Sequence, residues 1–207
     1  METTRIAENN AISALSISRD ESFFIVSGNG FVSKYCYPVI AKQVSQSLDA
    51  FIWSSAISSD NQKIFLCDLN GKGVLVYSTV TLDNISRVIY NGNGVFSSYL
   101  LLRPGWLING LENGQIAILS ERLLQEVWRA PRHFDVINAF TSLRDEQSFF
   151  SAGSDKRIVH TDIESFGILG SIKCQQPIDS LNHSIDQKYL FAGGREGNLY
   201  QFGISDY

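Results

Sequence analysis

The strongest constraint on the fold is a pattern that returns about every 41 residues along the 207-residue chain. Each copy reads as an alternating apolar strand, a polar turn, a short apolar strand, a second turn and another alternating strand. The second turn supplies one anchor position in each of five copies: Gly30, Gly73, Gly114, Lys156 and Gly197. The anchors are 43, 41, 42 and 41 residues apart. A step this constant over five copies indicates a true internal repeat.

The repeat predicts an all-β chain, because period-two alternation and tight polar turns oppose helical repeats of similar length. A fourth strand can be placed after each of the first four copies, at residues 40–44, 85–89, 124–128 and 168–172. Repeats of about 40–45 residues with four strands each are typical of β-propellers. We therefore expect residues 1–207 to form a single β-propeller domain of about five four-stranded antiparallel blades. The repeats are placed at about 12–44, 52–89, 95–128, 136–173 and 177–207.

The fifth repeat leaves no room for a fourth strand before Tyr207. The segment Thr3–Glu8 precedes the first repeat and could fill that place, which would close the ring by pairing the two ends of the chain. Closure would hide a strand edge that otherwise invites aggregation. The alternatives are a reduced form of a larger ring, or an open ring that a partner completes with a blade of its own.

The repeats resemble those of the WD-repeat family over nearly the whole chain. The fourth repeat, from Ile137 to Ile158, follows the family pattern best, and Ala192–Leu199 in the fifth is close behind. The Trp-Asp pair that names the family is absent; the fourth repeat has Thr161-Asp162 instead. The Gly-His pair is also absent, although His133 keeps its His half. The resemblance implies propeller blades, whereas these departures argue against a complete His–Ser–Asp–Trp hydrogen-bond network of the family type.

Composition excludes several classes of protein. The chain has 17 Lys and Arg against 21 Asp and Glu, a net charge of −4, which opposes general nucleic-acid binding. Cys36, Cys67 and Cys174 show no metal-binding spacing and are expected to be free thiols, so we predict no cofactor or metal. The sequence shows neither a signal peptide nor a membrane-spanning apolar run. We therefore expect a cytoplasmic or nuclear protein with no membrane partner.

Catalytic patterns are missing from the sequence. None of the three histidines lies in a Gly-x-Ser-x-Gly elbow. Four aspartates recur, but each occupies the same polar turn, where an Asp bonds its own backbone. These aspartates are Asp20, Asp60, Asp145 and Asp186. We therefore expect the chain not to be an enzyme.

One basic and aromatic cluster is the candidate site for partner binding. It combines the loop into the fourth repeat with turns of the fourth and fifth repeats, which should emerge on the same face of neighbouring blades. Its predicted residues are Trp128, Arg129, Arg132, His133, Lys156, Arg157 and Arg195. Arginine and aromatic residues are enriched where proteins bind partners. An acidic or phosphorylated protein segment would fit, and RNA backbone less well. The alternative is an ordinary charged rim, relieved by Asp135, Asp155 and Glu196.

The leading functional hypothesis is a non-enzymatic scaffold that holds protein partners in a multiprotein complex. Two alternatives come from the family resemblance. One is a hydrolase like the diphthine methylesterase-like members, and the other is a ribosome-biogenesis factor in a ribonucleoprotein, suggested by Ala192–Leu199. A carbohydrate-binding propeller is disfavoured, because Trp53, Trp106 and Trp128 do not share a register.

Overall fold

The computed structural model of the chain describes residues 8–70, 73–90, 94–101 and 105–204. By compactness it divides into two parts, Met1–Val95 and Phe96–Tyr207, and each is described by itself. The predicted pairing of Thr3–Glu8 with the last repeat lies outside the described residues, apart from Glu8. The Glu8 carboxylate accepts hydrogen bonds from Tyr35 and Lys42 in the first repeat.

The N-terminal part forms one antiparallel sheet in the order β1-β2-β3-β4-β5-β6. Its strands are β1 (Ile12–Ile17), β2 (Phe23–Cys36), β3 (Ala41–Ile57), β4 (Lys63–Asp68), β5 (Gly73–Ser78) and β6 (Asn84–Ile89). The long strand β2 contains two predicted strands. The residues that flank it are hydrogen-bonded to each other, with the Tyr37 N–H donating to the Ser22 carbonyl at 3.0 Å. β2 therefore folds back on itself, with Gly30 at a φ of 79° in the predicted turn. β3 runs from the fourth strand of the first repeat into the first strand of the second.

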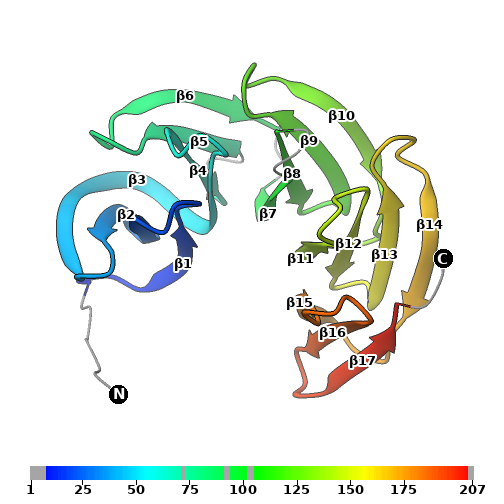
Figure 1. The fold of residues 1–207 in the computed structure, drawn as a ribbon. Coiled ribbons are helices and arrows are strands. Elements are labelled where there is room, and N and C mark those ends of the chain that lie inside the picture. The colour runs from blue at the N-terminus through cyan, green and yellow to red at the C-terminus, as the bar shows by residue number, and fades with distance from the viewer. Residues whose placement is uncertain (1–7, 71–72, 91–93, 102–104, 205–207) are drawn as a thin grey trace. The chain divides into compact units, whose positions relative to one another are not determined.

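The C-terminal part contains three antiparallel sheets, with orders β10-β9-β8-β7, β11-β12-β13-β14 and β15-β16-β17 (Figure 1). The first holds β7 (Val95–Leu101, beginning at the last residue of the N-terminal part), β8 (Trp106–Leu111), β9 (Gln115–Ser120) and β10 (Glu126–Pro131). The second holds β11 (Ile137–Ser142), β12 (Ser148–Gly153), β13 (Arg157–Asp162) and β14 (Ile168–Lys173). The third holds β15 (Ile178–His183), β16 (Tyr189–Gly194) and β17 (Leu199–Gly203). The all-β prediction is confirmed, and the described residues form no helix.

The recurring aspartates make the turn that the sequence predicts. Asp20, Asp60, Asp145 and Asp186 each accept, through Oδ1, the N–H of the residue two positions on, at 2.9–3.2 Å. The residue between donor and acceptor has a φ of 52–59° in all four turns. This side-chain bond replaces a backbone turn contact, which explains why Asp recurs at this position.

The second turns also follow the repeat, with one exception. Gly30, Gly114, Lys156 and Gly197 have φ values of 79, 78, 65 and 90°. These are left-handed conformations, which glycine adopts without the steric cost that a Cβ brings. The exception is Gly73, which begins β5.

Neighbouring sheets of the C-terminal part pack face to face. In the C-terminal part, Ile108 and Ile118 of the third repeat meet Ile137 and Phe149 of the fourth. The next residue, Phe150, points to the opposite face and packs with the fifth repeat. Successive residues of a strand face opposite sides of its sheet. Because both faces are covered here, β12 is buried at all six positions rather than at alternate ones, including its two serines.

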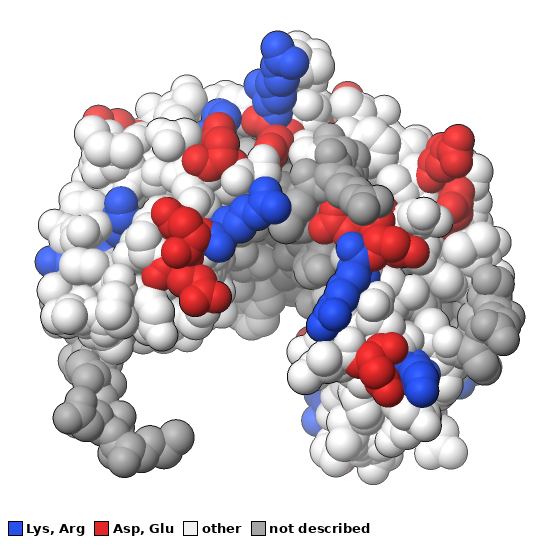
Figure 2. Space-filling view, in the orientation of Figure 1, with Lys and Arg blue, Asp and Glu red and all other residues white. Residues whose placement is uncertain are grey.

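Antiparallel pairing in chain order gives each sheet two distinct ends. The first and third turns of a repeat lie at one end, which we call the first-turn end. The second turn and the connection to the next repeat lie at the other, which we call the second-turn end. On the face seen in Figure 2, Lys and Arg side chains lie beside Asp and Glu side chains rather than gathering by sign. Among the described residues, no helix has the length and apolar character needed to cross a membrane.

Candidate interaction site at the second-turn end

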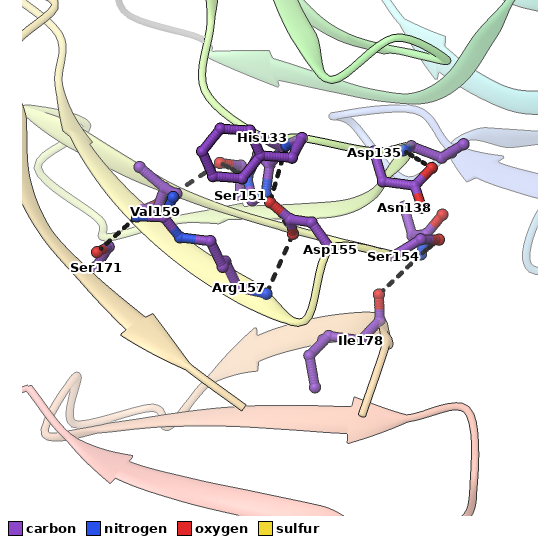
Figure 3. A network of polar contacts seen from close by, with 12 residues as sticks. His133, Asp135, Asn138, Ser151, Ser154, Asp155, Arg157, Val159, Ser171 and Ile178 are labelled. Atoms are coloured by element: carbon purple, nitrogen blue, oxygen red, sulfur yellow. Dashed lines mark hydrogen bonds and ion pairs between the residues drawn. The ribbon is translucent and has the colours of Figure 1, made fainter. Parts of the chain in front are cut away.

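A buried histidine holds the connection between β10 and β11 against the fourth repeat (Figure 3). His133 Nδ1 lies 2.9 Å from Asp155 Oδ1, and His133 Nε2 lies 2.8 Å from Ser151 Oγ. The His133 side chain is completely enclosed, with 0 % exposure. An ionised Asp155 carboxylate can only accept, so it accepts a hydrogen bond from His133 Nδ1–H. In that neutral tautomer Nε2 carries no hydrogen, and the Ser151 hydroxyl donates to it. The imidazole thus links the connection to both β12 and the second turn.

Asp155 is the centre of this hydrogen-bond network. Its Oδ2 accepts the backbone N–H of Phe134 at 3.0 Å, and its Oδ1 accepts that of Arg157 at 3.1 Å. Burial alone would raise the pKa of the Asp155 carboxyl, but the bonds from His133, Phe134 and Arg157 outweigh it and lower the pKa. One carboxylate therefore fixes the backbone of two segments, the β10–β11 connection at Phe134 and the end of the second turn at Arg157.

Further bonds join the fourth repeat to the fifth at the same end. The Asn138 amide donates to the Ile178 carbonyl at 2.9 Å and to Asp179 at 3.0 Å. The Arg195 guanidinium pairs with Asp179 at 2.8 Å and reaches Ser154 of the fourth repeat at 3.3 Å. The turn that carries Arg195 therefore lies beside the turn that carries Lys156.

The network presents one aromatic side chain to solvent. Phe134 is 84 % exposed although Asp155 holds its backbone N–H. The guanidinium carbon of Arg157 lies 5.4 Å from the centre of the Phe134 ring, and Arg157 also donates to Ser171. We call Phe134, Lys156, Arg157 and Arg195 the binding end. Phe134 ends the loop that the sequence prediction uses, but it is not among the predicted site residues.

Three predicted site residues lie apart from the binding end. Trp128 stacks on Phe166 of the β13–β14 turn, with ring centres 4.6 Å apart. The Arg132 guanidinium lies 4.8 Å from the Trp128 ring centre and donates to the Phe166 carbonyl. Arg129 pairs with Glu126 on the same strand. Because Phe166 is in a third turn, Trp128 and Arg132 extend toward the first-turn end and pack the third repeat on the fourth.

The prediction that His133 contacts a partner is corrected, because its enclosed ring cannot be touched. The Ser151–His133–Asp155 order resembles the nucleophile, base and carboxylate of a serine hydrolase. Ser151 has 0 % exposure, so no acyl group can reach its hydroxyl. The arrangement holds loops together instead. Among the described residues, no three His, Cys, Asp or Glu side chains converge in a way that could hold a metal ion.

Thr161 stands where the Trp-Asp pair would place its tryptophan. It is fully buried, and its hydroxyl has no hydrogen-bond partner. A buried hydroxyl without a partner costs about 1–3 kcal/mol. Thr161→Val keeps the side-chain shape and should raise the free energy of unfolding by about 1 kcal/mol in urea titrations. Thr161→Ser, which keeps the hydroxyl and loses a methyl group, should lower it. Equal losses in both variants would show that the hydroxyl is satisfied.

The comparisons with known proteins bear on the fold. No protein-family model matches the chain, and no curated protein matches it. A solved structure of U3-55K is similar, with a TM-score of 0.85 and 16 % sequence identity over 97 % of this chain. The fold is WD40-like. The chain spans 63 % of the length of that neighbour, and an identity this low shows the fold alone.

The fourth repeat forms three of the four members of the His–Ser–Asp–Trp network that the sequence resemblance implies. His133, Ser151 and Asp155 are in contact although the tryptophan is replaced by Thr161. The network is therefore incomplete, as the sequence predicts, but the tryptophan is the one member that is missing. The His–Ser–Asp contacts do not depend on an indole, because Asp155 and Ser151 each bond directly to the imidazole.

Proposed function

We propose that the chain is an interaction scaffold, a propeller of five blades that binds another protein at the binding end through contacts alone. The supporting observation is that Phe134 is 84 % exposed while Asp155 fixes its backbone. A loop whose backbone is already fixed loses little backbone freedom when it binds, so more of the contact energy becomes affinity. Aromatic and arginine side chains are the residues most enriched among binding hot spots.

The chemistry of the binding end favours a protein partner with an apolar pocket and an acidic or phosphorylated group. Phe134 would fill the pocket, and Lys156 would face the anionic group. Asp179 already neutralises Arg195, and Arg157 donates to Ser171. RNA would require several cations that are free to contact phosphates, so the ribonucleoprotein alternative has less support here. We propose that the protein acts in the cytoplasm or nucleus and that its ring is closed by its own chain or by a partner.

The double variant Phe134→Ala/Lys156→Glu tests the proposal. Loss of one aromatic hot spot costs about 2 kcal/mol, so affinity should fall about 30-fold while the melting temperature stays unchanged. Partners recovered with the tagged chain are identified by quantitative mass spectrometry, and the affinity of each is then measured by calorimetry.

The matched control is Ile185→Ala/Arg144→Glu at the first-turn end. Ile185 is 83 % exposed and Arg144 is exposed, so this variant removes a similar apolar side chain and reverses the same charge. It should bind partners like the unsubstituted protein. Unchanged binding by the Phe134 variant, or an equal loss in both, would exclude the binding end.

A further inference from the structure

A second serine–histidine pair lies in the β11–β14 sheet, at the end opposite to the one that His133 contacts. His160 Nε2, on β13, is 2.7 Å from Ser148 Oγ at the start of β12. The distance is that of a nucleophile and its general base. Ser148 and His160 are mostly buried, with 7 % and 8 % exposure.

This pair differs from Ser151–His133 because it borders open space. Ser148 and His160 line a cavity of about 440 Å³ that opens to solvent. The other residues that line it are Leu143, Asp145, Gln147, Asp162, Leu169 and Ile204. The volume is within the range of small-molecule sites, and the lining combines apolar walls with a few polar groups, as such sites do.

The His160 ring is held in position by its neighbour across the strand pair. It stacks on Phe150, with ring centres 4.1 Å apart and 14° between the planes. Burial lowers the pKa of His160, and the nearby Asp162 carboxylate opposes that shift without cancelling it. The imidazole is therefore neutral near pH 7 and able to accept a proton from Ser148.

We infer that Ser148 is a nucleophilic serine and that His160 is its general base, in a site for acyl esters. Ser148 Oγ bonds to the acyl carbon while His160 Nε2 takes the hydroxyl proton. The bond from the acyl carbon to the ester oxygen then breaks, and His160 gives the proton to the departing alcohol. Water, deprotonated by His160, then attacks the acyl group, and the proton returns to Ser148 as the acid leaves.

Two features of the cavity bear on its substrate. The Gln147 backbone is held on both sides, by Asp145 at 3.2 Å and by Ile163 at 2.9 Å. Its side-chain amide can donate an N–H to the acyl oxygen as negative charge develops there. The carboxylates of Asp145 and Asp162 repel anions, so the substrate class is uncharged or cationic esters. This activity is independent of the binding end, which lies at the other end of the strands.

A fluorophosphonate probe on the whole chain tests the inference without knowledge of the substrate. Attack by Ser148 forms an oxygen–phosphorus bond and releases fluoride, and peptide mass spectrometry locates the adduct. We expect modification of Ser148 and none of the enclosed Ser151. Ser148→Ala should abolish the adduct. His160→Phe preserves an aromatic ring against Phe150 but removes the base, and should slow labelling about 100-fold.

The pH profile of the unsubstituted protein tests the base even if the His160 variant fails to fold. The labelling rate should be constant above neutral pH and fall only below the ordinary histidine value of 6.5, because the pKa of His160 is lowered. Labelling that rises with hydroxide concentration up to pH 9 would overturn the inference. So would an equal rate in His160→Phe, or no adduct on Ser148.

Discussion

Replacing Asp155 with alanine should lower the free energy of unfolding by about 3–5 kcal/mol, because three donors lose their acceptor at once. Those donors are His133 Nδ1 and the backbone N–H groups of Phe134 and Arg157. The His133 ring is enclosed, so water cannot replace the lost carboxylate. Urea titration followed by circular dichroism measures the change.

Asp135 provides the matched control, because it is an exposed aspartate in the same connection. Its side chain accepts a hydrogen bond from the adjacent Val136 N–H, so Asp135→Ala should change stability by about 0.5 kcal/mol or less. If the two alanine variants were equally stable, Asp155 would not be the centre of the network.

The same carboxylate makes stability depend on pH. The pKa of Asp155 is lowered in the folded chain from an ordinary value of 3.8. Its contribution is therefore complete above pH 3.8 and is lost as the pH falls through the lower folded-state pKa. Asp155→Asn cannot titrate, so this part of the acid dependence should disappear from its unfolding curves. An acid dependence identical to that of the unsubstituted protein would assign the effect to other carboxylates.

Gly153→Ala is the second variant with a large expected effect. A Cβ at Gly153 would lie 2.4 Å from the Val136 carbonyl oxygen, which accepts the Ser154 N–H at 2.8 Å. Because the obstacle is backbone, the β11–β12 pairing must shift, at a cost of about 2–4 kcal/mol. The shift would also displace the turn that carries Asp155. Thermal unfolding monitored by calorimetry measures the loss.

Gly197→Ala separates this clash from backbone strain. Gly197 has a φ of 90°, and a Cβ there meets nothing within 4 Å. Its substitution should cost about 1–2 kcal/mol, through conformation alone. The account requires the larger loss at Gly153; the reverse order would mean that the β11–β12 pairing tolerates a side chain.

The repeat was readable in the sequence because its signals are local. Asp145 bonds the N–H only two residues away, and Lys156 occupies its turn through backbone conformation, so neither depends on distant packing. The sites depend on neighbours from other strands. The Phe134 backbone is held by Asp155, 21 residues on, and Trp128 is held by Phe166 from the next repeat. Likewise, the Ser148–His160 contact arises only from the register of β12 and β13.

Hydrogen–deuterium exchange at the Phe134 and Arg157 amides tests most directly whether Asp155 fixes the binding end. Both amides donate to Asp155, so they should exchange slowly in the unsubstituted protein. In Asp155→Ala both should exchange rapidly, and partner affinity should fall with them. Rapid exchange in the unsubstituted protein, or slow exchange that persists in Asp155→Ala, would contradict the account.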